Sequence, residues 1–355
     1  MTPGQSRLRR EAAAERRRRR RRIAVGLGVV AAVAIAVALL AANGSGEHPS
    51  QGRHTAAKTT TPAVKTATLS PAGFTLGPPV LSMPGIGTAA KDPIQLEFRH
   101  PPRAGLLFNL QTGQVLWQRN AFTRLRIASL TKMMTALLTV KAAPASAPVL
   151  VTKEAIDESG SKVGVLPLHK RVRLETLLYG LLLPSGNDAA VALAQHVAGS
   201  KQAFVERMNR EAARLGMGCT HYSTPSGFVD QGNYSCAADL AMLAHVDLEQ
   251  PRIARVTHTL SAELPFPIKG GKLWLYNNNP LLIYHYPGTT GLKTGYTEAA
   301  GRCLVATAER DGVKLGAIVL DSNAPGTQDK QLLDRGFEDV YHLARVSEPP
   351  MPPGA

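Results

Sequence analysis

The sequence predicts an α/β (α+β) fold in which strands near both ends of the folded region enclose a helical middle. Two apolar runs flank a turn within residues 104–120, a pattern typical of a β-hairpin. Helical periodicity follows from residue 129 to residue 217, and three strand-like segments lie between residues 291 and 322. The chain therefore reads as strands, then inserted helices, then strands again.

Local patterns predict the elements of the first half. The hairpin "AGLLFNLQTGQVLWQRN" (104–120) turns at "QTG". The apolar run that starts at Ser129 predicts a buried helix. In "LETLLYGLLLPSGNDAAVALAQHVAG", one helix is expected to stop near Pro184 and a second to begin around Asp188.

The second half shows the same change of pattern. "KQAFVERMNREAARLGM" has the 3.6-residue period of an amphipathic helix that ends near Gly216. "GLKTGYT", "GRCLVATAE" and "VKLGAIVLDS" read as strands, and a last helix is expected at about residues 327–344. The sequence contains no internal repeat.

The positive charge is concentrated at the N-terminus. The formal net charge is +15, and residues 1–22 hold ten arginines against two glutamates, which leaves +7 for the rest of the chain. The sequence has no zinc-finger spacing, RNP-like aromatic motif or second long basic run, so we expect no nucleic-acid partner. Residues 1–22 are better explained as a cytoplasmic segment that flanks a membrane.

An apolar segment follows directly. Residues 23–42, "IAVGLGVVAAVAIAVALLAA", carry no charged or strongly polar side chain, and as a helix they would span about 30 Å, the thickness of a bilayer core. Seven arginines precede the segment, so the positive-inside rule predicts a single-pass anchor with the body outside the cytoplasm. A cleaved signal sequence is the alternative, although its apolar stretch is normally only about 7–15 residues.

Composition divides the remainder of the chain. Residues 43–93 are rich in Gly, Ser, Thr, Ala and Pro, which predicts a disordered linker with a reach of about 40 Å. Residues 94–346 are expected to fold as one domain, and residues 347–355 form a Pro-rich tail. Cys219 and Cys236 are close enough in sequence for a disulfide, but the sequence is equally compatible with two thiols.

Ser129 and Lys132 are candidates for a catalytic nucleophile and its base. Three residues apart on a helix, they lie on one face about one turn apart. A serine hydroxyl is a poor nucleophile until a base removes its proton, and a desolvated neutral lysine is such a base. By itself this spacing is common, with Ser as a helix cap and Lys reaching to solvent.

Two further motifs follow in order. "SGN" at residues 185–187 lies between two apolar helices, where a helix-capping turn is the ordinary explanation. "KTG" at residues 293–295 lies in a strand, where an exposed edge is the ordinary explanation. Each motif is common, but the ordered trio is typical of penicillin-binding enzymes and class A β-lactamases, which carry S-D-N in the middle.

On these motifs the chain resembles a known family. "IASLTKMMTALL", "LLLPSGNDAAVALA", "MNREAARLGM" and "GLKTGYTEAAGRCLVA" are similar to the low-molecular-weight penicillin-binding proteins, the serine-type D-alanyl-D-alanine carboxypeptidases. The resemblance covers about residues 95–345. It implies a two-subdomain serine β-lactamase/penicillin-binding-protein-like fold, with an antiparallel sheet flanked by helices, an inserted all-helical subdomain and an active site between them.

The resemblance also implies catalytic roles. Ser129 would form an acyl-enzyme with the penultimate D-alanine of a peptidoglycan stem peptide, and Lys132 would accept its proton. A second cation at Lys293 would lower the pKa of Lys132, as burial does. Ser185 would relay the proton to the leaving amine. The backbone N–H groups of Ser129 and Tyr296 would form the oxyanion hole.

Substrate binding is expected from the same motifs. Asn187 would hold the substrate amide, and Lys293 and Thr294, with Gly295 and Tyr296 beside them, would hold the terminal carboxylate. β-Lactam antibiotics would act as inhibitors, and no metal or cofactor is expected. Where relatives often carry a carboxylate-binding arginine, this chain has Lys314, a less directional partner, so that role is in doubt.

Four other functions are alternatives to a D-alanyl-D-alanine carboxypeptidase. The motifs do not separate a carboxypeptidase from a D,D-endopeptidase. A β-lactamase needs a deacylating base, usually a glutamate. Glu206 is a glutamate, but its spacing fits the exposed face of an amphipathic helix. A zinc carboxypeptidase is disfavoured because the ten histidines are scattered without a His-Glu-x-x-His motif. A non-catalytic cell-wall binding protein would not need the intact serine and lysines.

Overall fold

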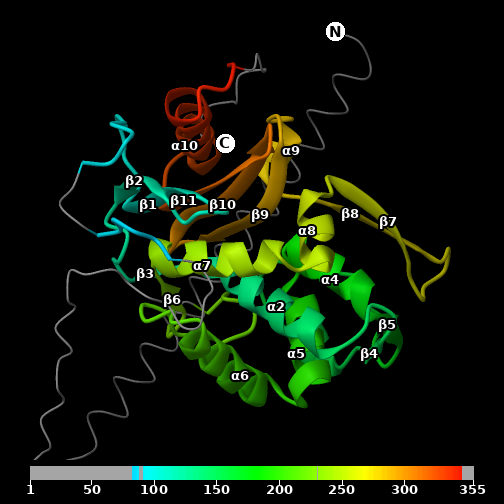
Figure 1. Cartoon of the computed structure of the whole chain (residues 1–355). Coiled ribbons are helices and arrows are strands. Elements are labelled where there is room, and N and C mark those ends of the chain that lie inside the picture. The colour runs from blue at the N-terminus through cyan, green and yellow to red at the C-terminus, as the bar shows by residue number, and fades with distance from the viewer. Residues whose placement is uncertain (1–81, 88–90, 230, 346–355) are drawn as a thin grey trace, which may run out of the picture. The chain divides into compact units, whose positions relative to one another are not determined.

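A five-stranded sheet joins segments from the two ends of the folded chain (Figure 1). The strand order is β2-β1-β11-β10-β9, and every neighbouring pair is antiparallel. The strands are β1 (Ala104–Asn109), β2 (Val115–Arg119), β9 (Thr289–Thr297), β10 (Gly301–Arg310) and β11 (Val313–Ser322). The predicted fold class, the hairpin and the three C-terminal strands are confirmed.

The structure is a computed structural model that describes residues 82–87, 91–229 and 231–345. Several predicted segments lie outside the described residues: the Arg-rich segment 1–22, the apolar segment 23–42, most of the linker 43–93 and the tail 347–355. Within the described ranges, no helix has both the length and the apolar composition needed to cross a membrane.

Helices cover both faces of the sheet. α10 (Pro325–Arg335) packs on one face, and α7 (Ala237–Leu248) and α8 (Pro251–His258) pack on the other (Figure 1). Because neither face is left to solvent, β10 and β11 each have six consecutive buried residues instead of alternating buried and exposed ones. The sheet is thus a rigid wall on which a site can be built.

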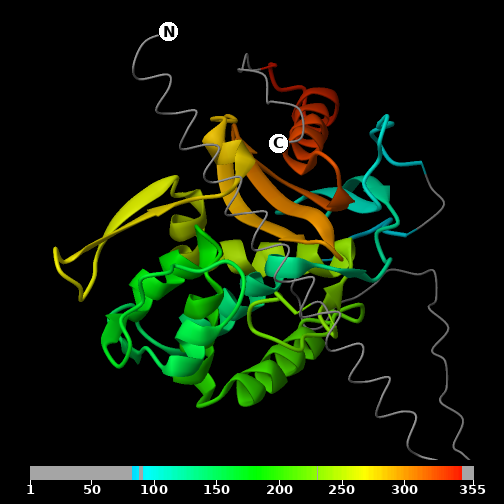
Figure 2. The same cartoon turned by 180° about the vertical axis from the view of Figure 1, so that it is seen from behind.

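The inserted helices form the second subdomain, which lies against the α7 side of the sheet (Figure 2). Its helices are η1 (Ala128–Thr131), α2 (Lys132–Ala142), α3 (Lys153–Asp157), α4 (Leu174–Leu182), α5 (Asn187–Ala198) and α6 (Lys201–Arg214). The pairs β3 (Leu125–Arg126) with β6 (Tyr234–Ser235) and β4 (Pro148–Leu150) with β5 (Arg171–Arg173) tie its loops together. The predicted break near Pro184 falls between α4 and α5, as expected.

The C-terminal helix differs from its prediction. α10 ends at Arg335 and continues as a π-helical turn, η2 (Gly336–Val340), so the helical segment stops before residue 344. Phe337 is fully buried in this turn, and its carbonyl accepts a hydrogen bond from the Leu343 amide at 2.9 Å. Packing of Phe337 on the sheet and this contact close the turn, which a helical period alone does not reveal.

Packed residues also extend upstream of residue 94. Met83 and Ile86, within the predicted linker, are buried in the core. Asp92 accepts a hydrogen bond from the Gln118 amide at 2.8 Å. The composition of this stretch is that of a linker, but two apolar side chains and one carboxylate are enough to attach it to β2.

A second hairpin was not predicted. β7 (Ser261–Pro265) and β8 (Lys272–Tyr276) pair in antiparallel register and project from the body of the molecule (Figures 1 and 2). The short helix α9 (Pro280–Ile283) follows and leads into β9. Neither strand is long or strongly apolar, so the sequence gives only a weak strand signal here.

Candidate active site

Ser129 lies in the 3-10 turn η1, directly before the helix that begins at Lys132. The preceding Ala128 has a φ of 47°, a left-handed value that turns the chain sharply at this point. Ser129 is half-buried and lines a cavity, whereas Lys132 is fully buried. The chain thus presents the hydroxyl at a surface and keeps the amine behind it.

Three groups surround the Lys132 amine. Its Nζ lies 2.8 Å from Ser129 Oγ, 2.7 Å from Asn187 Oδ1 and 2.8 Å from the Ser226 carbonyl oxygen. The Asn187 amide orientation is fixed from its other side, because Nδ2 donates to the Ser159 carbonyl at 2.6 Å. Asn187 Oδ1 and the Ser226 carbonyl therefore act only as acceptors toward Lys132.

The environment favours neutral Lys132. Burial lowers its pKa well below the usual lysine value, and the nearby Lys293 lowers it further, while Asp188 and Glu158 act weakly in the opposite direction. A neutral amine has two N–H bonds and one lone pair. With both N–H bonds directed at acceptors, the lone pair is left for the Ser129 hydroxyl.

Ser185 and Asn187 lie at the start of α5. Ser185 adopts a φ of 66° in the turn after α4, lines the cavity and is only 6% exposed. Within the described residues, its hydroxyl has no hydrogen-bond partner. Asp188, the residue that suggested a simple helix cap, holds a neighbouring loop instead by accepting from the Val163 and Gly164 amides at 2.9 and 3.0 Å.

The edge strand β9 supplies the opposite wall. Lys293 is 2% exposed, and its Nζ donates to the Thr294 carbonyl at 3.0 Å. Burial lowers the pKa of Lys293 to about 7, so this amine is far less basic than the charged lysine that the motif predicts. Thr294 and the 63% exposed Tyr296 line the cavity.

Gly295 sets the distance between the walls. A Cβ at this position would lie 2.9 Å from the Ile127 carbonyl oxygen and 3.3 Å from the backbone nitrogen of Ser129. Only glycine lets β9 approach the Ser129 amide this closely. The motif glycine therefore has a steric function that its position in a strand does not reveal.

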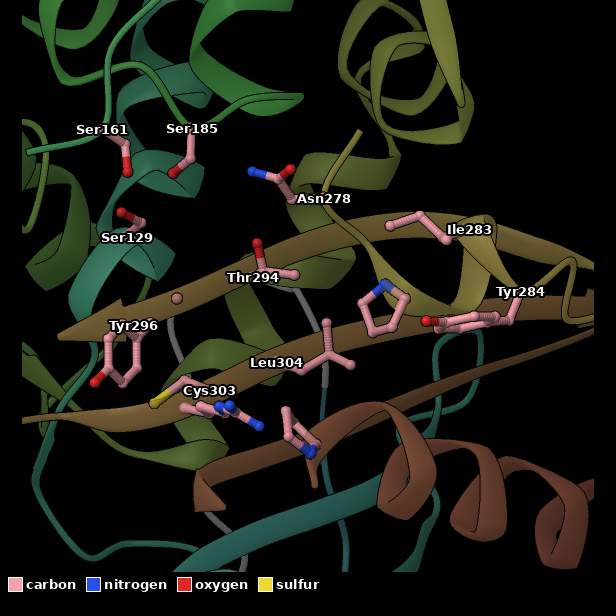
Figure 3. Close-up of a pocket in the computed structure, with 14 residues that line it drawn as sticks. Ser129, Ser161, Ser185, Asn278, Ile283, Tyr284, Thr294, Tyr296, Cys303 and Leu304 are labelled. Atoms are coloured by element: carbon pink, nitrogen blue, oxygen red, sulfur yellow. The ribbon is translucent and has the colours of Figure 1, made fainter. Parts of the chain in front are cut away.

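The cavity between the walls has a volume of about 400 Å³. Its lining comprises Ser129, Ser161, Ser185, Asn278, Pro280, Ile283, Tyr284, Thr294, Gly295, Tyr296, Arg302, Cys303, Leu304 and Pro325. In Figure 3 the hydroxyls of Ser129, Ser161 and Ser185 point toward one another, across from Thr294. Five predicted site residues thus reach the cavity, whereas Lys132, Asn187 and Lys293 are buried behind its lining.

Two contributors were missed from the sequence. Among the described residues that line the cavity, the cation is Arg302 on β10, whose partner in the β-ladder is Tyr296. The register could have revealed it, since residues opposite Tyr296 share its face of the sheet. The Ser226 carbonyl had no detectable signal, because a backbone oxygen is present at every residue.

A disulfide closes the segment that carries Ser226. Cys219 and Cys236 are bonded, which resolves the alternatives left open by the sequence. Within this segment the Pro225 carbonyl accepts from Thr135 Oγ1 at 2.7 Å, and a Cβ at Gly227 would collide with the Ala128 carbonyl. The segment is therefore packed directly against η1 and α2.

Two doubtful residues lie elsewhere. Lys314 pairs with Glu309 at 3.5 Å on β10 and β11 and does not line the cavity. Glu206 is on an exposed face of α6 near Arg210, at 3.9 Å. Among the described residues, no Asp or Glu lines the cavity, so the structure places no deacylating carboxylate beside Ser129.

Fold and site together define the class of the serine penicillin-binding enzymes: an antiparallel sheet, an inserted helical subdomain, and a Ser–Lys pair at their junction. The model of the D-alanyl-D-alanine carboxypeptidase family matches residues 91–324. The chain belongs to this family, as its motifs indicated.

Individual relatives agree with this assignment. The D-alanyl-D-alanine carboxypeptidase DacF of Bacillus subtilis is 34% identical over 68% of this chain and 63% of its own length. A D-alanyl-D-alanine endopeptidase of Pseudomonas aeruginosa is 32% identical over 70% of this chain and 81% of its own length. The chain thus spans less than two thirds of DacF.

Solved structures share the fold. A D-alanyl-D-alanine carboxypeptidase from Mycobacterium tuberculosis aligns with a TM-score of 0.65 and 30% identity, over 72% of this chain and 97% of that one. The Streptomyces K15 DD-transpeptidase aligns with a TM-score of 0.64 and 29% identity, over 68% of this chain and 99% of that one.

Proposed function

We propose that this protein is a serine-type D-Ala-D-Ala carboxypeptidase that removes the terminal D-alanine from peptidoglycan stem pentapeptides. The observation that carries the proposal is the environment of Lys132, a fully buried amine 2.8 Å from Ser129 Oγ with two acceptor-only groups on its other sides. A base within this distance of a hydroxyl is positioned to take its proton. Family membership supports the same reaction.

Acylation follows from this geometry. Ser129 Oγ attacks the carbonyl carbon of the penultimate D-alanine while its proton moves to Lys132. The backbone N–H groups of Ser129 and Tyr296 stabilise the oxyanion, at roughly 3–4 kcal/mol per donor. Gly295 allows this arrangement, because it brings β9 against the Ser129 amide.

The leaving group requires a proton. Ser185 lines the cavity with its hydroxyl unbonded among the described residues, so it is placed to pass a proton from Lys132 to the departing D-alanine amine. The C–N bond breaks and the amine leaves neutral. A water molecule then attacks the acyl carbon while Lys132 takes its proton, the ester bond to Ser129 Oγ breaks, and Lys132 returns the proton to Oγ as the shortened peptide leaves.

The terminal carboxylate selects the substrate. Thr294 offers a hydroxyl in the cavity, and Arg302 offers a guanidinium that can form a bidentate pair with a carboxylate. Lys293 lies behind the cavity lining, so its contribution is electrostatic, and a bound carboxylate would raise its pKa from about 7. Carboxylate binding therefore favours the protonated, positively charged form of Lys293.

Asn187 also orients the Lys132 amine, besides the role expected for it. Both ends of its amide are already bonded, to Lys132 and to the Ser159 carbonyl. We assign it to positioning the lysine, and holding the substrate amide stays a prediction, since these two bonds leave the second N–H of Nδ2 unused.

The decisive experiment combines two measurements on one protein. Intact mass spectrometry after benzylpenicillin should detect a covalent adduct, and a pentapeptide stem should release D-alanine. Ser129→Ala should abolish both while the circular dichroism spectrum stays unchanged. An adduct that persists in Ser129→Ala would remove Ser129 as the nucleophile.

A D,D-endopeptidase is the second candidate, supported by the Pseudomonas aeruginosa relative, of which this chain covers 81%. Cross-linked muropeptide dimers and pentapeptide monomers should be compared at equal concentration. Faster cleavage of the dimers would favour the endopeptidase. β-Lactams would inhibit either activity by acylating Ser129, and slow hydrolysis of that adduct is expected, since no carboxylate of the described residues lines the cavity.

Membrane attachment is proposed from the sequence alone. Residues 1–22 would be cytoplasmic, residues 23–42 would span the membrane and the catalytic domain would lie outside. Protease added to intact cells should then release the domain by cutting within residues 43–81. A mature N-terminus after residue 42 would identify a cleaved signal sequence instead.

A further inference from the structure

The β7–β8 hairpin exposes two large aromatic side chains. Trp274 is 59% exposed and Tyr276 is 66% exposed, while the alternating residues Leu273 and Leu275 are buried. On a strand, residues two apart lie on the same face, so the two rings lie side by side. A contiguous exposed apolar surface with polar groups at its rim marks an interaction or ligand-binding site.

This face continues into the candidate active site. The alternation extends past β8, because Asn277 is buried and Asn278 is exposed. The Asn277 amide donates to the Leu260 carbonyl at 2.8 Å, which prolongs the hairpin pairing. Asn278 lines the cavity, and Figure 3 shows its side chain directed toward Ser185. Tyr276 then lies about 7 Å from Asn278 along the strand, and Trp274 about 13 Å.

Polar groups accompany the rings. Glu263 is opposite Trp274 in the register and pairs with Lys272 at 2.5 Å. Ser261 is opposite Tyr276. An aromatic face bordered by a carboxylate, an ammonium and a hydroxyl suits a ligand with apolar C–H faces and many hydroxyl and amide groups. A pyranose ring of an N-acetylated sugar is such a ligand.

The charge of the hairpin weighs against a membrane surface. Between residues 261 and 276 the chain has one glutamate and two lysines. Anionic bilayers attract clusters of about 4–8 basic residues. The hairpin lacks such a cluster.

We propose that the exposed face of β8, with Trp274 and Tyr276, binds the glycan strand of the polymer whose stem peptide enters the cavity. This inference rests on the proposed function. In a pentapeptide stem, four residues separate the sugar from the bond that is cut, and extended they span about 13 Å. This length is counted from the bond at Ser129, so a stem that leaves the cavity past Asn278 directs its sugar, and the glycan strand beyond it, toward Tyr276 first and Trp274 next.

The test compares substrates with and without sugar, using the full-length protein. For a sugar-free stem pentapeptide, the double variant Trp274→Ala/Tyr276→Ala should keep kcat/KM within twofold of the parent. For uncross-linked glycan strands bearing the same stem, kcat/KM should fall at least tenfold. The matched control is Ile268→Ala, an exposed apolar residue (38%) at the tip of the same hairpin, which should affect neither substrate.

Binding can be measured without turnover. The chain has two tryptophans, and Trp117 is 6% exposed, so a change in fluorescence on ligand binding reports mainly on Trp274. A β-1,4-linked N-acetylglucosamine hexamer should shift the emission of Ser129→Ala protein to shorter wavelength. Adding Tyr276→Ala should weaken this binding at least fivefold.

The outcomes separate the two proposals. If the parent neither forms a penicillin adduct nor releases D-alanine, the proposed function fails, whatever the hexamer does. If the parent is active but the aromatic double variant treats both substrates like the parent, or the hexamer leaves the emission unchanged, the glycan surface is wrong. Loss of binding to phosphatidylglycerol vesicles in the double variant, with glycan binding intact, would identify a lipid surface and also overturn the proposal.

Discussion

The two walls of the cavity each bury one lysine, but they hold it differently. On the helical wall, Lys132 has three oxygen neighbours within 2.8 Å, from η1, α5 and the segment closed by the disulfide. On the sheet wall, Lys293 donates to the carbonyl of the next residue, and burial lowers its pKa to about 7. Three contacts thus fix the position of the Lys132 amine, whereas the protonation state of Lys293 can change near neutral pH.

The difference matches the tasks that we propose. A general base works best when its lone pair is aimed at one proton, which the contacts of Lys132 achieve. A group that responds to a substrate carboxylate works best when its charge can change on binding, and a pKa of about 7 gives Lys293 that property. The walls therefore separate proton transfer from charge recognition.

The largest expected effect comes from the rigid wall. Lys132→Ala should slow acylation by benzylpenicillin about 10⁴-fold over the accessible pH range, because no other base contacts Ser129 among the described residues. Stopped-flow acylation rates measure the effect. Lys153→Ala, on an exposed lysine, is the matched control and should acylate like the parent. Near-normal acylation in Lys132→Ala would disprove the lysine-base mechanism.

A change in the spacing between the walls should rank second. In Gly295→Ala, the new Cβ would press on the Ile127 carbonyl, so β9 must move away from the Ser129 amide. Loss of one oxyanion donor lowers kcat about 10²-fold or more. Gly218→Ala, with open space around its Cβ, controls for the added methyl group. Unchanged kcat in Gly295→Ala would show that the spacing does not matter.

Charge recognition on the sheet wall should have a smaller effect. Arg302→Gln should lower kcat/KM for a stem pentapeptide roughly 10–100-fold, since hydrogen bonds to charged groups contribute about 1.5–3 kcal/mol. A pentapeptide with a C-terminal amide should be affected much less. Lys314→Gln, outside the cavity, is the control. An equal loss of kcat/KM for the free acid and the amide would mean that Arg302 does not bind the carboxylate.

The smallest effect concerns coupling between the walls. Lys293 is the second cause of the lowered pKa of Lys132, after burial. Lys293→Ala should raise the pKa of Lys132, and since acylation needs the neutral amine, the acidic limb of the rate–pH profile should move to higher pH. Lys293→Arg keeps the charge and should leave the limb near that of the parent. An unmoved limb in Lys293→Ala would show that the two lysines titrate independently.

The sequence by itself determined the main elements and the motif residues. Periodicity located the hairpin, the helices and the three C-terminal strands, because apolar spacing follows directly from the geometry of each element. The three motifs named Ser129, Ser185 and Thr294, which reach the cavity, because such chemistry needs particular side chains at particular spacings. The family followed from their order.

Only the tertiary structure decided the groups that act through position. The Ser226 carbonyl and Arg302 join the site through packing of segments far apart in the sequence. The state of Lys293 also changed, from an expected charged amine to one with a pKa of about 7, because burial depends on what surrounds a residue and not on its neighbours in the chain. Side-chain identity is local information, whereas distance, desolvation and backbone contacts are properties of the folded molecule.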